Sequence, residues 1–206
     1  DPDCNGLRFI ADLQRTHGAS LAGLLEERVA RQREFDEGKL PDFNPATEGI
    51  RSDNSCKVGE IPSDLMYRWV ELTGPANTPI WVRGALNSGA NTWMADYEDA
   101  LSPFFLNLIA NTYNLKDAIM RRGDFDPQVG QFRLNESVAT LLTRPRGLHL
   151  HEKHMLVDGQ PVSATIFDLG MIHYHLTPEQ LSRGQTPAHY MPKLEHQFES
   201  RWLAGL

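Results

Sequence analysis

Three acidic side chains lie within four residues of the segment TWMADYEDALSP (92–103): Asp96, Glu98 and Asp99. They directly follow Trp93 and Met94, which belong to a short apolar run. Carboxylates this close to a core repel one another and resist dehydration, so they must either project into water or face a positive group. The first question that the sequence raises is what that positive group would be.

Arg144 is the strongest candidate for the positive group. It ends the apolar segment VATLLTR (138–144) and is followed by Pro145, Arg146 and Gly147. A surface turn is one interpretation of TRPRG, and a cation at the end of a strand, opposite the three carboxylates, is the other. Asp96 and Asp168 have a plain alternative as well, because an aspartate in such a place often caps a helix or forms a turn.

Short apolar segments alternate with helix-length segments over most of the chain. The predicted strands cover 80–86, 91–99, 138–144, 163–169 and 188–195, and the predicted helices cover 103–122 and 170–184. Such alternation indicates parallel strands joined by helical crossovers. Asp158-Gly159 lies between two apolar pieces and predicts a β-hairpin insertion near 154–163.

Four of these five predicted strands end on ionisable residues, which are Asp96 with Glu98 and Asp99, then Arg144, then Asp168, and then Lys193 with Glu195. In a parallel β/α barrel all strand carboxyl ends open on one face, and that face carries the chemistry. An open α/β sheet would also place function there. Since neither G-x-G-x-x-G nor G-x-x-x-x-G-K-[ST] occurs, the barrel is preferred.

The part before the barrel reads as a helical arm. Residues 7–36 have helical periodicity in two segments, with Gly18 and Ser20 between them, and the second segment stops at Gly38. A stretch rich in Pro, Gly, Asn, Asp and Ser follows, which is typical of a connecting arm. We therefore predict an arm over 1–63 and an incomplete (β/α)8 barrel over 64–206, an α/β fold.

Composition excludes several classes of function. The 206 residues carry 27 acidic and 20 basic side chains, a net charge of −7 that disfavours nucleic acid and acidic membranes as partners. No apolar run approaches the roughly 20 residues of a membrane helix, and no signal peptide is visible, so we expect a protein that is not secreted. Both ends are expected to lie within a longer polypeptide.

Other catalytic motifs are absent from the sequence. HLHEKH (149–154) contains three histidines but not the H-E-x-x-H spacing of a zinc protease, so no transition-metal site is predicted there. No G-x-S-x-G serine motif occurs either. The two cysteines, Cys4 and Cys56, have no metal-knuckle spacing and are expected to be reduced.

Several long motifs, in this order, resemble the malate synthases of the shorter, glyoxylate-cycle type. They are LPDF (40–43), GEIPSDLMYRWVELTGP (59–75), ALNSGANTWMADYEDALSP (85–103), NLKDAI (114–119), RPRGLHLHEKH (144–154) and MPKLEH (191–196). The resemblance implies an N-terminal helical arm that clasps a (β/α)8 barrel. It also implies condensation of acetyl-CoA with glyoxylate, with Mg²⁺ holding the glyoxylate, and hydrolysis to malate and CoA.

The resemblance assigns roles to three residues. Arg144, the first of RPRG, corresponds to the arginine that stabilises the enolate of acetyl-CoA. Glu98 and Asp99 resemble the acidic pair near the metal and are expected to reach it through bound water. The family's direct metal ligands and its catalytic aspartate lie beyond Leu206, so no direct metal ligand is expected in this chain and these residues alone are expected to be inactive.

Two departures from the family pattern stand out: His151 replaces the usual proline, and MIHYHLT (171–177) is more polar than expected. Two alternatives stay open, a truncated non-catalytic relative that serves as an assembly subunit and a lyase of malyl-CoA or citramalyl-CoA. The expected partner is the rest of the same polypeptide or a complementary subunit. The resemblance implies a cytoplasmic or a peroxisomal, glyoxysomal location.

Overall fold

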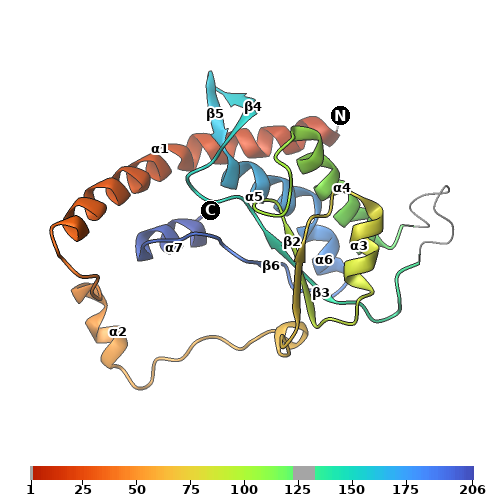
Figure 1. Cartoon of the computed structure of the whole chain (residues 1–206), viewed down its shortest axis with the longest axis horizontal. Helices are drawn as coiled ribbons and strands as arrows, with labels where there is room; N and C mark the ends of the chain where they lie inside the picture. The colour runs from red at the N-terminus through yellow and green to blue at the C-terminus, as the bar shows by residue number, and fades with distance from the viewer. Residues whose placement is uncertain (1, 123–132) are drawn as a thin grey trace.

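The computed structural model describes residues 2–122 and 133–206, and it contains a parallel four-stranded sheet in the order β1-β2-β3-β6 (Figure 1). A helix follows each strand of this sheet, directly in three cases and after an inserted hairpin in the case of β3. In chain order the elements are β1 (Glu71–Gly74), α3 (Pro79–Leu86), β2 (Thr92–Asp96), α4 (Phe105–Met120), β3 (Thr140–Arg144), α5 (Ala164–His175), α6 (Thr177–Ser182), β6 (Ala188–His189) and α7 (Gln197–Ala204).

Strand order follows chain order and every pair is parallel, which is the arrangement of consecutive strands in a (β/α)8 barrel. Four strands are half of the eight that close such a barrel. The prediction of a helical arm followed by about the first half of a barrel is therefore confirmed. In the register, Asp96 lies opposite Arg144 and Thr143 lies opposite His189, so the carboxyl ends of β2, β3 and β6 are level.

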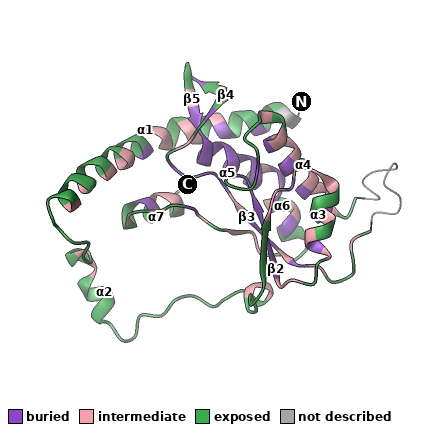
Figure 2. Cartoon of the chain, viewed as in Figure 1, coloured by how far each residue is buried: buried purple, intermediate pink, exposed green. Residues whose placement is uncertain are grey.

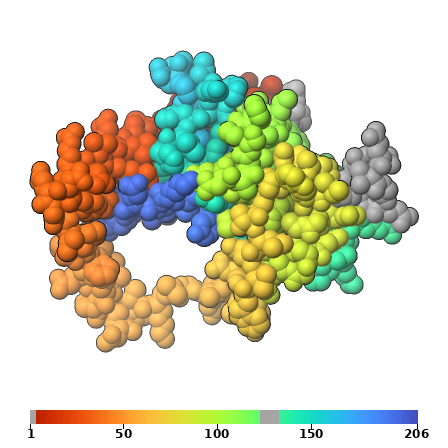
Figure 3. All heavy atoms as spheres, in the orientation of Figure 1, coloured from red at the N-terminus to blue at the C-terminus, as the bar shows by residue number. Residues whose placement is uncertain are grey.

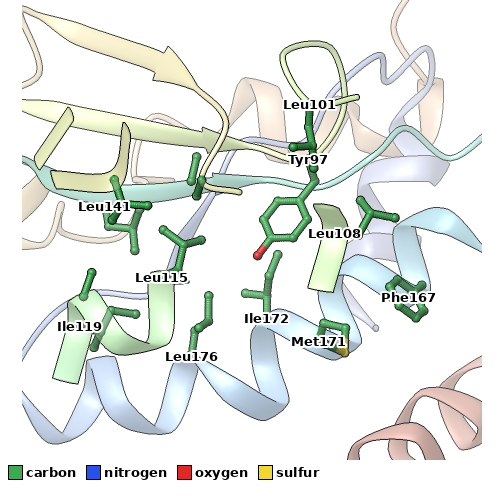
Figure 4. Close-up of a cluster of buried hydrophobic side chains, with 14 of the residues drawn as sticks. Tyr97, Leu101, Leu108, Leu115, Ile119, Leu141, Phe167, Met171, Ile172 and Leu176 are labelled. Carbon is green, nitrogen blue, oxygen red and sulfur yellow. The ribbon is translucent and has the colours of Figure 1, made fainter. Parts of the chain in front are cut away.

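The core lies between the sheet and helices α4 and α5. All residues of β2 are buried, and so are residues 164–172 of α5 (Figure 2). Figure 4 shows the ring of Tyr97 reaching from the end of β2 into this cluster, with Leu108 and Leu115 of α4 and Ile172 of α5 around it. The central strands are thus fixed by apolar burial on the helix side.

Helix α1 (Pro2–Asp36) crosses the outer side of α5 as one continuous helix. The predicted break at Gly18 and Ser20 is wrong, because Ser20 Oγ bonds the carbonyl of His17 within the helix and the helical turns continue. The predicted end of the helix, at Gly38, agrees with the structure: the last helical residue is Asp36, and Gly38 has a left-handed φ of 94°. The bonds Gly38 N to Phe35 O and Lys39 N to Glu34 O form a Schellman cap there.

A close helix contact holds α1 against α5. Ile10 of α1 is fully buried, and a Cβ built on Gly170 of α5 would lie 2.5 Å from Ile10 Cγ1. Only glycine permits the two helices to approach this closely. Helix α5 is therefore covered on one side by the sheet layer and on the other by α1, which explains why nearly all of it is buried.

The arm between α1 and the sheet contains only short helical turns, η1 (Pro45–Thr47), α2 (Glu48–Ser52) and η2 (Ser63–Leu65). Figure 3 shows the arm as a separate band of atoms around an opening, with α1 and α7 on the other side. Large apolar side chains of the arm face solvent, among them Leu40 (81% exposed), Val58 (94%) and Trp69 (84%). In the described residues the arm has little apolar surface to pack against.

Three strand predictions need correction. The segment 80–86 lies in helix α3, because Pro79 begins a helix whose Val82 and Leu86, four residues apart, face the core. In the segment 163–169, all residues after Ser163 lie in α5, a helix buried on nearly all sides, which has the same continuous apolar pattern as a buried strand. The segment 188–195 is a strand only at Ala188–His189, and β1 (Glu71–Gly74) was not predicted.

An antiparallel hairpin interrupts the alternation between β3 and α5. Strands β4 (His151–Val157) and β5 (Gln160–Ser163) pair on either side of Asp158-Gly159, where both residues have positive φ. This is the turn chemistry from which the hairpin was predicted. The hairpin projects from the body of the protein beside α1 (Figure 1), and Arg15 of α1 binds Asp158 at its tip.

Candidate functional site at the mouth of the half barrel

The acidic segment turns sharply at the end of β2. Asp96 is buried, and its carboxylate accepts hydrogen bonds from the backbone N–H of Glu98 at 2.9 Å and of Ala100 at 3.0 Å. Asp96 therefore shapes the loop that follows the strand rather than capping helix α4. Because side chains alternate here, Tyr97 enters the core while Asp96 and Glu98 lie on the mouth side.

Arg144 is the positive group opposite these acids. Its NH2 donates to Glu98 Oε2 at 2.9 Å and also binds Asp99 Oδ2, and its NH1 lies 3.5 Å from Asp96 Oδ2. The Arg144 side chain is 15% exposed and that of Glu98 is 3% exposed. The structure therefore brings together the three residues singled out from the sequence, Arg144, Glu98 and Asp99.

Lys193 adds a second cation to the same carboxylates. Its Nζ lies 2.9 Å from Glu98 Oε1 and 3.0 Å from Asp99 Oδ1. It follows β6 and has a left-handed φ of 54°, which aims the side chain back toward the end of β2. Sequence reasoning noted Lys193 as a strand-end residue but did not pair it with the acids.

The cluster is close to electrical balance. Asp96, Glu98 and Asp99 carry three negative charges, and Arg144 and Lys193 carry two positive charges. Burial would lower the pKa of Arg144, but the charge of Asp96 and the contacts with Asp99 and Glu98 outweigh it and raise the pKa. Hydrogen bonds from Lys193 and Arg144 lower the pKa of Asp99 below its ordinary value. The contacts with Glu98 and Asp99 likewise raise the pKa of Lys193, so each of these three shifts favours the charged form.

A second, buried ion cluster lies directly behind Arg144. Arg146 donates from Nε to Asp168 Oδ2 at 2.9 Å and from NH2 to Asp168 Oδ1 at 2.7 Å, and its NH1 donates to Glu152 at 2.9 Å. Asp168 is therefore not a strand-end residue of the mouth but a buried helical residue of α5. The interpretation of TRPRG as a surface turn is wrong for Arg146, which is 5% exposed.

Gly147 lies where the loop after β3 meets the acidic loop after β2. Its N–H donates to Glu98 Oε1 at 3.0 Å, so the loop after β3 contacts the acidic loop after β2 directly. A Cβ built on Gly147 would lie 2.9 Å from that same oxygen and 2.9 Å from the ring of His149. A side chain at this position would have to displace the Glu98 carboxylate or the exposed His149 ring.

The carboxylates of the described residues do not form a ready metal site. Within residues 2–122 and 133–206, no three His, Cys, Asp or Glu side chains are placed to share a metal ion. Both oxygens of Glu98 and of Asp99 already contact Arg144 or Lys193. The arrangement instead presents a fixed guanidinium. The Nε of Arg144 is buried and has no hydrogen-bond partner among the described residues.

Several functional contacts could not be seen in the sequence. Glu152 and Asp168 bind Arg146, and His154 binds Glu152. Arg28 of α1 binds Glu199 of α7, 171 residues later in the sequence. Local patterns cannot reveal such pairs. The only signal was chemical, since charges inside apolar segments such as SATIFDL need a partner.

The fold and the site together define the amino-terminal half of a (β/α)8 barrel with an arginine–carboxylate cluster at its mouth. Two family models match the chain: "Malate synthase, N-terminal domain" over residues 5–49 and "Malate synthase, TIM barrel domain" over residues 140–206. The chain is 41% identical over 196 residues to malate synthase of Myxococcus xanthus, and 41% identical over 199 residues to the glyoxysomal malate synthase of Candida tropicalis. It is 40% identical over 208 residues to malate synthase of Oryza sativa.

These matches cover 95–98% of this chain but only 36% of each of the three relatives. The chain belongs to the malate synthase family and corresponds to the N-terminal part of its members. The resemblance on which the sequence analysis rested is therefore confirmed.

Proposed function

We propose that this chain is the N-terminal portion of a malate synthase and supplies the arginine that stabilises the enolate of acetyl-CoA. In the proposed reaction a base takes a proton from the acetyl methyl group, and the resulting enolate carbon attacks the aldehyde carbon of glyoxylate. The new alkoxide takes up a proton, and water then cleaves the thioester to give malate and CoA. The catalytic base is expected in residues outside this chain.

One observation carries the proposal: the guanidinium of Arg144 is fixed, largely buried and still has a free donor. A thioester enolate places negative charge on oxygen, and preorganised donors in a site poor in water stabilise such charge best. Glu98 and Asp99 hold NH2, which leaves Nε without a partner in the described chain. An arginine also stays protonated through the catalytic cycle, so it acts as a permanent electrostatic group rather than an acid.

The family resemblance also implies Mg²⁺, and the described carboxylates do not fit its direct coordination. Mg²⁺ prefers six oxygen ligands in octahedral geometry. Here the oxygens of Glu98 and Asp99 contact Arg144 and Lys193, and those of Asp96 accept backbone N–H groups. We assign the direct ligands to residues outside this chain, with Glu98 and Asp99 in the surrounding water shell.

The test is Arg144→Ala in the intact enzyme, with Lys193→Gln as the matched comparison. Both substitutions remove a cation from the same two carboxylates, but only Arg144 is proposed to contact the enolate. Loss of one preorganised donor lowers kcat by roughly 100- to 1,000-fold, with KM for acetyl-CoA little changed. Lys193→Gln is expected to lose less. Equal losses in both variants, or an unaltered kcat in Arg144→Ala, would refute the role of Arg144.

The exposed apolar arm favours a second candidate function, assembly with another subunit. Leu40, Val58 and Trp69 face solvent, and β1 is an open edge of the sheet that could accept another strand. In an intact malate synthase the rest of the polypeptide would cover both surfaces. The mass of the natural polypeptide separates the two candidates: a chain of 23.3 kDa that forms a stable complex and has no turnover would favour the assembly role.

The location follows the relatives. Those from Candida tropicalis and Cucumis sativus are named glyoxysomal, so we propose a cytoplasmic or peroxisome-like location. Within the described residues, no helix is both long enough and apolar enough to cross a membrane. Acetyl-CoA and glyoxylate are the proposed substrates.

A further inference from the structure

We propose that the buried cluster of Arg146, Asp168 and Glu152 is a positioning device for Arg144. This inference rests on the proposed function, because it takes Arg144 to be the group that stabilises the enolate. Arg146 binds Asp168 of helix α5 and Glu152 of the hairpin. None of its described hydrogen bonds or ion pairs reaches Asp96, Glu98 or Asp99. Its effect on the site is therefore indirect.

Asp168 holds Arg146 at three points. Its Oδ2 accepts from the backbone N–H of Arg146 at 2.8 Å and from Nε at 2.9 Å, and its Oδ1 accepts from NH2 at 2.7 Å. Such a planar fork fixes orientation as well as distance. Because Asp168 is on α5, which is packed between the sheet layer and α1, the fork ties the loop after β3 to the most buried helix of the protein.

The backbone of Arg146 is fixed on both sides. While its N–H bonds Asp168, its carbonyl accepts from the hydroxyl of Thr165 at 2.7 Å. Only Pro145 separates this anchored peptide from Arg144, and a proline ring locks its own φ. The direction in which Arg144 leaves the end of β3 is therefore set within two residues of the fork.

Glu152 provides a second anchor from the hairpin. One of its oxygens accepts from NH1 of Arg146 at 2.9 Å. The other accepts from the backbone N–H of His154 at 2.9 Å and lies 2.6 Å from His154 Nδ1. Burial would raise the pKa of Glu152, but the bonds from His154 and Arg146 outweigh it and lower the pKa. The hairpin thus closes the fork from the side opposite α5.

Geometry rather than stability explains why charged groups occupy this place. A buried ion pair contributes little more to folding than apolar residues of the same size, whereas it fixes a particular orientation. A displacement of about 1 Å in a catalytic group can cost about 100-fold in rate. The cluster is where this chain would control that displacement.

The experiment is Arg146→Lys in the intact enzyme. Lysine keeps the charge but cannot bind both oxygens of Asp168 and reach Glu152 at once. We expect kcat to fall roughly 10- to 100-fold with little change in KM for acetyl-CoA. The matched control is Arg15→Lys, because Arg15 makes the same two-point fork with Asp158, at 2.9 Å and 2.9 Å, on the exposed surface. That control should leave kcat unchanged.

A double-mutant cycle separates positioning from simple support of the fold. If Arg146 acts through Arg144, the Arg146→Lys effect on kcat should disappear in the Arg144→Ala background. An effect of the same size in both backgrounds would overturn the inference. If Arg146→Lys fails to fold, judged by circular dichroism, Glu152→Gln takes its place, since it weakens the second anchor with an uncharged side chain of the same shape.

The outcomes distinguish this inference from the proposed function. A large loss in Arg144→Ala combined with normal kcat in Arg146→Lys, or in Glu152→Gln where that variant replaces it, overturns the positioning role alone. Full activity of Arg144→Ala refutes the assigned role of Arg144 and the inference with it. A loss of kcat in Arg144→Ala and in Arg146→Lys, with no further loss when the two are combined, supports both the proposed function and the positioning role.

Discussion

The two cations at the mouth are held in different ways. The loop that carries Arg144 is anchored from within the half barrel, by Asp168 of α5 and Glu152 of the hairpin. The loop that carries Lys193 is anchored from outside it, by Arg28 of α1, whose NH2 donates to the carbonyl of Lys193 at 3.0 Å. Arg28 also forms a fork with the buried Glu199 of α7, at 2.7 and 3.0 Å.

The comparison assigns a task to the N-terminal helix. The loop of Arg144 is anchored through Arg146, whose partners Glu152 and Asp168 are 6 and 22 residues away, between β3 and α5. Lys193 depends on a residue 165 positions earlier. Helix α1 is thus part of the framework of the mouth, and a defect in its docking should disturb Lys193 before it disturbs Arg144.

Removing Arg28 should have the largest effect on stability. Arg28→Met leaves Glu199, whose side chain is 1% exposed, without its cation, and an uncompensated buried charge costs about 3–5 kcal/mol of the free energy of unfolding. Equilibrium urea unfolding measures this loss. Arg15→Met is the control, because its pair with Asp158 lies exposed to solvent and contributes little to stability. Similar losses in the two variants would mean that the Arg28 fork is an ordinary surface pair.

Replacing both partners sharpens the same point. In Arg28→Met with Glu199→Leu no charge is left unpaired, so more than half of the stability lost in the single variant should return. The Lys193 carbonyl still loses its donor, so the loop should remain displaced. Faster amide hydrogen exchange of the residues near 193 would reveal this displacement. Full recovery of both stability and protection would argue against a role of Arg28 in holding the loop.

Gly170→Ala tests the docking of α1 against α5, near the N-terminal end of α1 where Ile10 lies. The added methyl group would lie 2.5 Å from Ile10, and overpacking of this kind costs about 1–3 kcal/mol. Gly23→Ala is the control within α1, since nothing lies within 4 Å of its Cβ position, and it should stabilise the helix by about 0.5–1 kcal/mol. The two variants should therefore shift the urea midpoint in opposite directions. Shifts of the same sign would contradict the close contact.

The smallest expected effect concerns acid stability. Burial would raise the pKa of Glu199, but the bonds from Arg28 and from the backbone N–H of Glu195 lower it from the ordinary value of 4.5. A carboxyl with a lowered pKa in the folded state contributes stability above its unfolded pKa and loses it as pH falls through the folded value. Between pH 5 and 3 the wild-type chain should therefore lose stability more steeply than Glu199→Gln. Parallel curves would disprove the linkage.

The predictable parts of the fold were those with a clear period. Strands β2 and β3 and helix α4 are bounded by turn residues and have the expected length, so the sequence indicated them. Helix α5 was mistaken for a strand because a helix buried on all sides has no polar face to reveal its period. Strand β1 was missed because an exposed edge such as Glu71–Gly74 has no apolar alternation.

The same error limited the prediction of the site. Arg144, Glu98 and Asp99 could be paired because each follows a correctly predicted strand, and parallel strands bring their carboxyl ends together. Asp168 was placed at the end of a strand that is in fact helix α5, so its pairing with Arg146 was not predicted. The contact of Lys193 depends on a left-handed residue in a loop, which no periodic pattern encodes.

Gly147 offers a simple criterion for comparing other sequences with this one. A Cβ at this position would lie 2.9 Å from Glu98 Oε1 and 2.9 Å from the exposed ring of His149, so a larger residue would have to displace one of the two. A related chain with alanine or serine here, but with the same arginine and acids, would need a turned His149 ring or a shifted Glu98 carboxylate. The residue at this one position therefore indicates how closely the loops after β2 and β3 can approach in a relative.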